Sequence, residues 1–282
     1  VANSLWASDE LRLDEDFVRV ARECYGADVR QLNFARDPVA KIINSWVDEQ
    51  THGKIERIVD KVDRDALLFL INAIYFKGSW TEPFNRKLTE RGAFHLAGGG
   101  TAECQLMTQR GRFRYYEDRA LQAVGLPYGG GRVCMYLFLP RPGVGLPKFL
   151  SELSAKRWEG WMGRFSSMEG RVSLPRFRLA YEAKLNDALR SLGMGIAFEH
   201  RADFGALAAD RSHIQIDEVR HKAFVEVNEE GTEAAAVTSV GMMRASFLPA
   251  KTFAMVMDRP FCCAIRDDQT GAILFMGAIL DP

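Results

Sequence analysis

The sequence predicts an α+β fold in which large β-sheets dominate and helices pack on them. Helix-like and strand-like segments alternate in the first third of the chain, and residues 65–80 form a long apolar run typical of a central strand. From residue 213 onward the pattern is again mostly β. With 282 residues, the chain is long enough to bury a large core without disulfides or a metal.

The first third predicts strand, helix, strand, helix. The chain opens in a strand-like segment, residues 1–6, and residues 14–25 place apolar side chains at helical spacing before Gly26, which suits a helix end. Residues 27–34 are extended. The second helix starts at Asp37-Pro38, with proline in its first turn, and Gly53 ends it.

The middle of the chain predicts a buried sheet. Residues 65–80 are apolar on both alternating sets of side chains, so we expect a central strand that is covered on both faces. Two runs of three glycines separate the next strands as turns. These strands are predicted at 91–117, 121–128 and 132–140.

The second half predicts two helical segments among strands. Residues 146–165 form a helical pair, 171–181 alternate like a strand, and 183–192 form a helix that Gly193 ends. The remaining strands are predicted at 213–228, 253–257, 261–265 and 272–279.

Residues 229–251 break this pattern. They lie between two clear strands, and connections of about 20 residues are usually functional. After Glu233 the first half is small, uncharged and free of proline, so it could enter a sheet as a strand.

Composition excludes several classes of function. Lys+Arg and Asp+Glu both number 37, so there is no basic excess for nucleic acid and no charge-driven membrane surface. The longest apolar stretch, 66–76, is too short to span a bilayer. The five cysteines include no C-x-x-C pair, and we expect them to be buried, small apolar groups.

Enzyme motifs are absent from the sequence. There is no G-x-S-x-G elbow, no H-E-x-x-H helix and no phosphate-binding glycine loop. The five histidines show no ligand spacing, so we expect His200 and His213 to be surface or turn residues rather than metal ligands. We predict no enzymatic activity, no metal and no cofactor.

Several segments resemble the serpin family of serine protease inhibitors. Residues 72–80, NAIYFKGSW, are similar to the family's most distinctive internal motif, and residues 230–236, EGTEAAA, are similar to the hinge of its reactive-centre loop. Residues 44–46 with 51–55 resemble its helix F region. The closing segments 259–261, 274–277 and 281–282 also match.

The resemblance covers nearly all of the chain. It implies a serpin fold with a large central sheet, two further sheets and packed helices. It also implies a single domain over 1–282 with the reactive-centre loop at 229–251. The family has helices and a strand before the segment that matches residues 1–6, about a quarter of the fold, so we expect the sequence to be incomplete at its N-terminus.

The resemblance implies a suicide-substrate inhibitor. A serine protease attacks the loop and forms an acyl-enzyme, and the cut loop inserts into the main sheet before the ester hydrolyses. The alternative is a non-inhibitory serpin that acts as a chaperone or carrier. The small-residue hinge favours inhibition, and its residues are Glu229, Glu230, Gly231, Thr232, Glu233, Ala234, Ala235 and Ala236.

The loop sequence fits insertion as a strand. Side chains alternate along a strand, so one face carries Thr232, Ala234, Ala236, Thr238, Val240 and Met242, none of them charged. The other face carries one charge, Glu233, at its start. A charge or a proline within 232–238 would stall insertion, and the sequence has neither in the buried set.

The resemblance also implies polar contacts that hold the sheet closed. Glu229 is expected to pair with Arg176, which can bind a carboxylate through two nitrogens. Asn72 and His221 are expected to hydrogen-bond between the two strands that separate, and Trp80 belongs to the same sheet-opening latch. The alternatives are a solvated charge pair and a histidine that faces water.

The reactive bond has three registers. Family spacing places it at Ala245–Ser246, which suits elastase-like or subtilisin-like proteases, and Arg244–Ala245 would suit a trypsin-like protease. Met243–Arg244 is a third option. We expect a monomer that partners a serine protease, with no nucleic acid and no membrane, and that is secreted or, alternatively, cytoplasmic.

Overall fold

The computed structural model describes residues 1–208, 214–232 and 251–282. Its α-helices are α1 (Glu15–Tyr25), α2 (Val39–Gln50), α3 (Leu146–Ser151), α4 (Ala155–Met162) and α5 (Asn186–Leu189). Short helical turns are η1 (Arg86–Leu88), η2 (Arg190–Met194) and η3 (Gly195–Phe198). The strands are β1 (Ala2–Ser8), β2 (Ala27–Leu32), β3 (Leu68–Tyr75), β4 (Gly78–Ser79), β5 (Glu90–His95), β6 (Thr101–Glu117), β7 (Leu121–Tyr128), β8 (Val133–Pro140), β9 (Ser166–Pro175), β10 (Phe177–Lys184), β11 (Glu218–Val227), β12 (Gly231–Thr232), β13 (Phe253–Val256), β14 (Phe261–Asp267) and β15 (Ile273–Ile279).

The chain divides into two compact units. Unit 1 comprises Val1–Phe76 and Ala180–Val225, and unit 2 comprises Lys77–Leu179 and Glu226–Pro282. The single domain expected from the sequence stays a prediction. Within the described residues, no helix is both long and apolar enough to cross a membrane.

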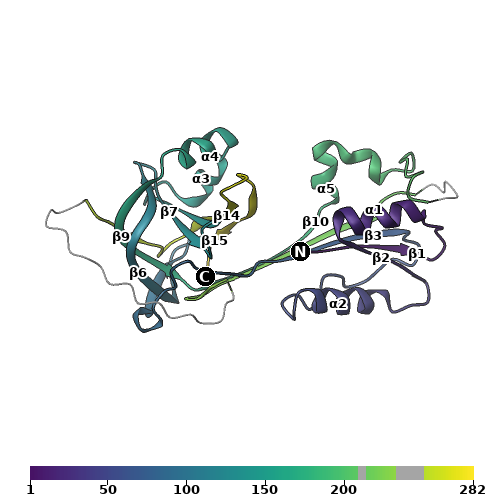
Figure 1. The fold of residues 1–282 in the computed structure, drawn as a ribbon, viewed down its shortest axis with the longest axis horizontal. Coiled ribbons are helices and arrows are strands. Elements are labelled where there is room, and N and C mark those ends of the chain that lie inside the picture. The colour runs from purple at the N-terminus through teal and green to yellow at the C-terminus, as the bar shows by residue number, and fades with distance from the viewer. Residues whose placement is uncertain (209–213, 233–250) are drawn as a thin grey trace. The chain divides into compact units, whose positions relative to one another are not determined.

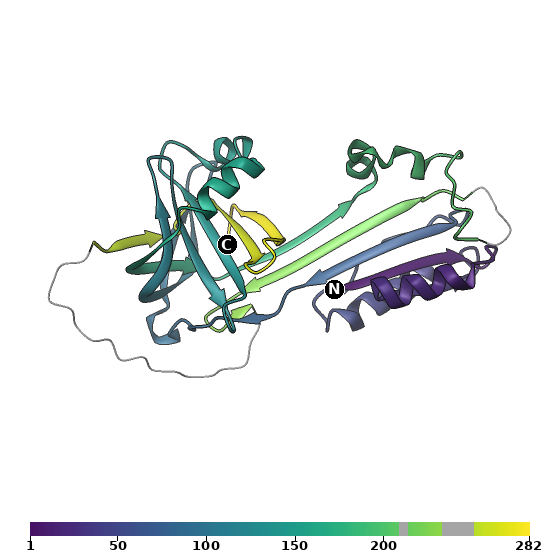
Figure 2. The ribbon, with the colours of Figure 1, turned by 45° about the horizontal axis from the view of Figure 1, so that its top comes forward.

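Unit 1 is built on a five-stranded sheet with the order β10-β11-β3-β1-β2 among the described residues. β1 pairs in parallel with β2 and antiparallel with β3, and β3 pairs in parallel with β11. Figure 2 shows β1 (purple), β3 (blue) and β11 (light green) side by side. The predicted order of strands and helices through β3 is therefore confirmed.

Helices α1 and α2 lie on opposite faces of this sheet (Figure 1). α1 begins after Asp14, whose carboxylate accepts from the N–H groups of Asp16 and Phe17, and ends at Gly26 in the left-handed conformation. α2 buries Ile43 and Trp46 against the sheet, where Trp46 meets Trp6 edge-on at 5.9 Å between ring centroids. Each fully buried side chain of this size contributes about 1.5–3 kcal/mol.

β3 is central in the sheet, as its apolar run predicts, but its two faces differ. Phe69, Ile71 and Ala73 are buried on the α2 face. On the other face Leu68 is buried, whereas Leu70 and Asn72 are only half-buried. In the described residues, full burial of both faces is therefore limited to the start of the strand.

Unit 2 contains an eight-stranded sheet, counted over the described residues, with the order β13-β9-β6-β7-β8-β14-β15 and with β5 paired to β6. α3 and α4 cover one face: Phe149 stacks on Trp161, with 5.3 Å between centroids, and both pack against Phe138. On the other face Tyr115 stacks on Phe253 at 3.7 Å. The helical pair predicted at 146–165 is confirmed as α3 and α4.

Three predicted boundaries were wrong. The range 91–117 is predicted as one strand, but it contains the first of the two predicted glycine turns: Gly99 and Gly100 have φ of 88° and 85°, and β5 and β6 lie on either side of them. Residues 171–181 divide into β9 and β10 after Pro175, because the chain leaves its pairing with β6 there and continues as the neighbour of β11. The helix predicted at 183–192 begins only at Asn186, since β10 extends to Lys184.

Candidate functional site

The turn after β11 is fixed by the backbone. Asn228 and Gly231 exchange N–H···O bonds of 2.9 and 3.2 Å, and the N–H of Glu230 donates to Oδ1 of Asn228 at 2.9 Å. β12 then pairs antiparallel with β4 through Gly231 and Ser79. The predicted hinge residues Glu229–Thr232 thus lie in an ordered turn within unit 2.

Gly231 holds a backbone conformation that other residues rarely adopt. Its φ is 137°, and a Cβ at this position would collide with the carbonyl oxygen of Gly78. Only glycine fits here, so the glycine of the predicted hinge has a steric reason in the turn itself.

Glu229 is buried in unit 2 and bound by Arg176. The guanidinium donates from Nε to both carboxylate oxygens at 3.0 Å and from Nη2 to Oε1 at 2.6 Å. The side chain of Glu229 is 3% exposed, whereas that of Arg176 is 46% exposed. The structure therefore brings together the two residues that the sequence paired.

Thr89 completes this carboxylate site, and no motif in the sequence indicated it. Its hydroxyl donates to Oε1 of Glu229 at 2.6 Å. Burial on its own raises the pKa of Glu229, but the hydrogen bonds from Arg176 and Thr89 outweigh burial, so that the pKa lies below its ordinary value. The carboxylate is thus held ionised.

Trp80 supports the same turn. Its Nε1–H donates to the carbonyl of Asn228 at 3.0 Å, and its ring stacks on Tyr128 with 4.3 Å between centroids. The hydroxyl of Tyr128 lies 2.9 Å from the hydroxyl of the buried Thr232. Trp80 is therefore part of the hinge cluster of unit 2, whose members are Trp80, Thr89, Tyr128, Arg176, Glu229, Gly231 and Thr232.

Unit 1 contains the other predicted pair. His221 on β11 faces Asn72 on β3 in the paired register, and Nδ1 of His221 lies 2.7 Å from Oδ1 of Asn72. Nδ2 of Asn72 donates to Oδ1 of Asn3 at 2.6 Å, and Asn3 donates to the carbonyl of Tyr25 at 3.3 Å. Asn3 was missed, because only the register of β1 against β3 reveals it. Burial lowers the pKa of His221.

The remaining predicted loop residues lie outside the described part of the chain. They are Glu233, Ala234, Ala235, Ala236, Thr238, Val240, Met242, Met243, Arg244, Ala245 and Ser246, and His213 also lies outside it. Among the described residues, no group of three or more His, Cys, Asp or Glu side chains could hold a metal ion.

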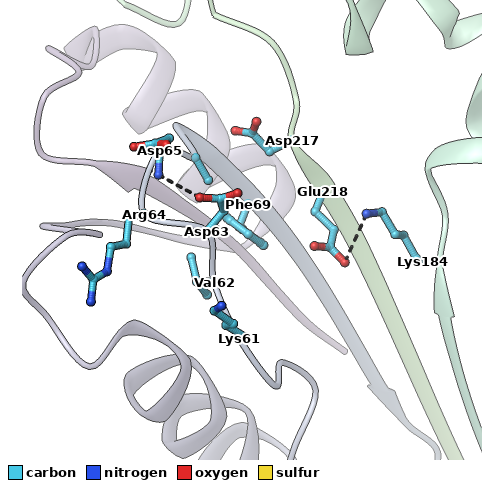
Figure 3. A pocket seen from close by; sticks show the side chains of 10 residues that line it. Lys61, Val62, Asp63, Arg64, Asp65, Phe69, Lys184, Asp217 and Glu218 are labelled. Atoms are coloured by element: carbon cyan, nitrogen blue, oxygen red, sulfur yellow. Dashed lines mark hydrogen bonds and ion pairs between the residues drawn. The ribbon is translucent and has the colours of Figure 1, made fainter.

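A large pocket in unit 1 has no clear chemical preference. Figure 3 shows side chains of both charge signs around it, with Lys184 3.8 Å from Glu218. The carboxylate of Asp217 accepts from the backbone N–H groups of Leu67 and Leu68 at 2.8 and 3.1 Å, so it stabilises the start of β3. Asp217 and Glu218 are already bonded within the fold, and the charges around the pocket have both signs, so the pocket does not indicate a ligand.

A family model described as serpin (serine protease inhibitor) matches residues 1–282. The chain belongs to the serpin family. Serpins are mainly protease inhibitors rather than enzymes, and the family includes extracellular and intracellular members. The α+β serpin fold predicted from the sequence is confirmed.

Similar serpins come from distant organisms. A serpin-like protein of Thermococcus kodakarensis is 36% identical over 99% of this chain and 66% of its own length. Leukocyte elastase inhibitor of Sus scrofa is 35% identical and neuroserpin of Homo sapiens 33%, each over 100% of this chain and over 77% and 71% of their own lengths. The chain thus spans about two thirds to three quarters of these relatives.

Solved serpin structures match the whole chain. Native tengpin, a thermophilic serpin, has a TM-score of 0.89 and 30% identity and is covered over 73% of its length. Human thyroxine-binding globulin, solved as a complex with its ligand, has a TM-score of 0.90 and 25% identity and is covered over 74%. The fold is therefore shared by a thermophilic serpin and by a thyroxine-binding protein.

Proposed function

We propose that the protein is a suicide-substrate inhibitor of serine proteases. The protease serine oxygen attacks the carbonyl carbon of the reactive bond, the C–N bond breaks, and the amine leaves with a proton, so that an ester joins the two proteins. The cut segment after β12 then enters the sheet of unit 1 as a new strand before water cleaves the ester. Trapping is a kinetic competition rather than equilibrium binding.

The topology of unit 1 supports insertion between β3 and β11. These strands are directly paired and parallel, from Glu218↔Phe69 to Phe224↔Tyr75. The chain turns back at residues 228–231, directly after β11. A segment that folds back beside β11 therefore runs antiparallel to β11 and also to β3. Placed between them, it can form backbone hydrogen bonds with both strands.

The side chains at the β3–β11 boundary support a separable pair. His221 and Asn72 contribute one neutral hydrogen bond across it, and such bonds have a net stability of about 0.5–1.5 kcal/mol. The uncharged residues at alternate positions of 232–242 can replace this contact without burying a charge. This match between a polar contact that an inserted strand can replace and an uncharged segment is the observation that carries the proposal.

The same proposal includes the class of target protease, the oligomeric state and the compartment of the inhibitor. The partner is a trypsin-like, elastase-like or subtilisin-like serine protease, according to whether Arg244 or Ala245 precedes the cut. We assign a monomer that acts outside the cell, with 229–251 as the reactive-centre loop of one serpin domain. A cytoplasmic inhibitor would use the same chemistry.

The complete gene product is tested beside residues 1–282 with trypsin, elastase, chymotrypsin and subtilisin. A protein–protease band that survives SDS is expected, and the mass of the released peptide identifies the reactive bond. The Ala236→Arg variant places a charge on the face to be buried, so we expect cleavage without the covalent band. The control Ala250→Arg lies beyond the cut and should leave the band unchanged.

Clean cleavage of the complete protein by all four proteases, with no covalent band, would refute inhibition and support a carrier or chaperone. A covalent band in Ala236→Arg equal to that of the unmodified protein would refute insertion of this face. If only residues 1–282 fail to trap, the trapping step needs segments outside them.

A further inference from the structure

One face of unit 2 carries a row of arginines. Successive residues of a strand point to opposite faces, and in β6 the residues Phe113 and Tyr115 are buried against Phe253. The alternate residues therefore point to the opposite face. Three of them are exposed arginines: Arg110, Arg112 and Arg114.

The helices of unit 2 cover only part of this face. Tyr116, which shares it, packs in the cluster formed by α3 and α4. Arg114 is next along β6 and is neutralised by Asp268, which also accepts from the hydroxyl of Tyr136. Beyond Arg114, Arg112 and Arg110 are exposed.

We define the arginine strip as Arg110 and Arg112 of β6 together with Arg171 of β9. Arg171 on β9 lies directly opposite Arg110 in the antiparallel pair. Within the described residues, none of the three has a carboxylate oxygen within ion-pair distance; Glu169 is opposite Arg112 in the ladder, whereas Arg110 and Arg171 face each other. Like charges directly opposite one another destabilise a sheet, so pairing within the fold does not account for this arrangement.

The strip lies beside the strand that follows the candidate reactive bond. Arg171 is opposite Ala254 of β13 on the other side of β9, and Ala254 is exposed. β13 begins at Phe253, seven residues after Ser246, and seven extended residues span at most about 25 Å. A protease domain of roughly 200 residues is about 40 Å across. A protease that attacks this bond can therefore reach the strip.

We infer that the arginine strip is an auxiliary docking surface for an acidic patch on the target protease. The inference rests on the proposed function. Arginine binds carboxylates through two parallel N–H groups and loses less entropy on binding than lysine. The net charge of the chain is zero, so the attraction is local to this face rather than a property of the whole molecule. Its main effect is on the rate of encounter.

The test measures the second-order rate of attack on the loop, counted as covalent complex plus cleaved inhibitor. The protease of the panel that attacks fastest is used in native form and after succinylation of its lysines, which makes its surface acidic. The strip variant combines Arg110→Glu, Arg112→Glu and Arg171→Glu. The control combines Arg12→Glu, Lys41→Glu and Arg64→Glu in unit 1, with the same change of net charge.

At 50 mM NaCl, the strip variant should slow attack by the succinylated protease about tenfold, and the control less than twofold. The difference should vanish at 500 mM NaCl, and the glutamine version of the strip variant should fall between. The fraction trapped covalently tests the proposed function separately, because it is a ratio of products and not a rate.

Equal slowing by both triple variants would refute the docking surface, as would rates for the succinylated protease that do not depend on salt. A strip variant that elutes earlier from immobilised heparin but reacts normally with both protease forms would also refute it, and would assign the strip to a sulfated polysaccharide. Near-ultraviolet circular dichroism confirms that the variants are folded.

Discussion

The pair Glu229–Arg176 should show a strong asymmetry between its two partners. Arg176→Met leaves a 3% exposed carboxylate without its cation, whereas Glu229→Gln leaves a guanidinium that water already reaches. Removal of one partner of a fully buried pair costs about 3–5 kcal/mol. Because Arg176 is half-exposed, we expect about 2–3 kcal/mol for Arg176→Met.

Glu229→Gln should cost less, about 1–2 kcal/mol. The amide oxygen can still accept from Thr89, and no buried charge remains. The double variant should resemble Glu229→Gln alone, so that the two single costs do not add. The matched control is Arg178→Met, which breaks an ion pair between a 73% exposed arginine and Glu226 and should cost less than about 1 kcal/mol.

Chemical denaturation followed by tryptophan fluorescence measures these free energies of unfolding, since Trp80 contacts the same turn. The pKa of Glu229 is lowered in the folded state, so its stabilisation is present above the unfolded value, about 4.5, and is lost as the pH falls through the folded value. Glu229→Gln should remove this acid-induced loss. An Arg176→Met cost equal to that of Arg178→Met, or additive single costs, would refute the reasoning.

Three further predictions test other parts of the site. Gly231→Ala should destabilise unit 2 by at least about 2 kcal/mol in the same denaturation assay, because its Cβ meets the Gly78 carbonyl, while Gly130→Ala, with open space around it, should cost under about 1 kcal/mol. Burial lowers the pKa of His221, so the folded state should lose stability as the pH falls below about 6.5. His221→Gln should flatten the stability profile between pH 7 and 5, and an unchanged profile would contradict this. Cys24 is exposed and the other four cysteines are buried, so a thiol reagent should label one cysteine in the native protein and five after denaturation. Burial raises the pKa of Cys134, Cys262 and Cys263 to about 12. Rapid labelling of any of these three in the native protein would show that the core opens.

Local signals predicted most of the fold. The apolar spacing of residues 14–25 predicted α1, the Asp37-Pro38 start and the Gly53 end predicted α2, and the long apolar run predicted the central position of β3. These signals need only neighbouring residues. The glycine run at 98–100 predicted the turn inside 91–117, and the positive φ values of Gly99 and Gly100 show that the chain reverses there.

The candidate site was predicted only as far as the family resemblance extends. Glu229, Arg176, Asn72 and His221 were paired in advance, and the structure places each pair within hydrogen-bond distance. Thr89 belongs to a short segment with no pattern of its own, so its contact depends on tertiary packing. The alternating arginines of β6 can be read from the sequence. The position of Arg171 opposite Arg110 follows only from the register of β9 against β6.

The two polar clusters differ in how firmly they should resist opening of the closed state. In unit 1 the contacts of Asn72 are two neutral hydrogen bonds, worth about 1–3 kcal/mol together. In unit 2 one buried carboxylate receives three N–H···O contacts from Arg176 and one hydroxyl bond from Thr89, and hydrogen bonds to charged groups contribute about 1.5–3 kcal/mol each. If entry of the cut segment requires both clusters to rearrange, the carboxylate site sets the larger barrier. Arg176→Met should then speed loop entry more than Asn72→Ala does, so that Arg176→Met gives the larger increase in the fraction of protease trapped. A larger increase for Asn72→Ala would place the main resistance at the β3–β11 boundary.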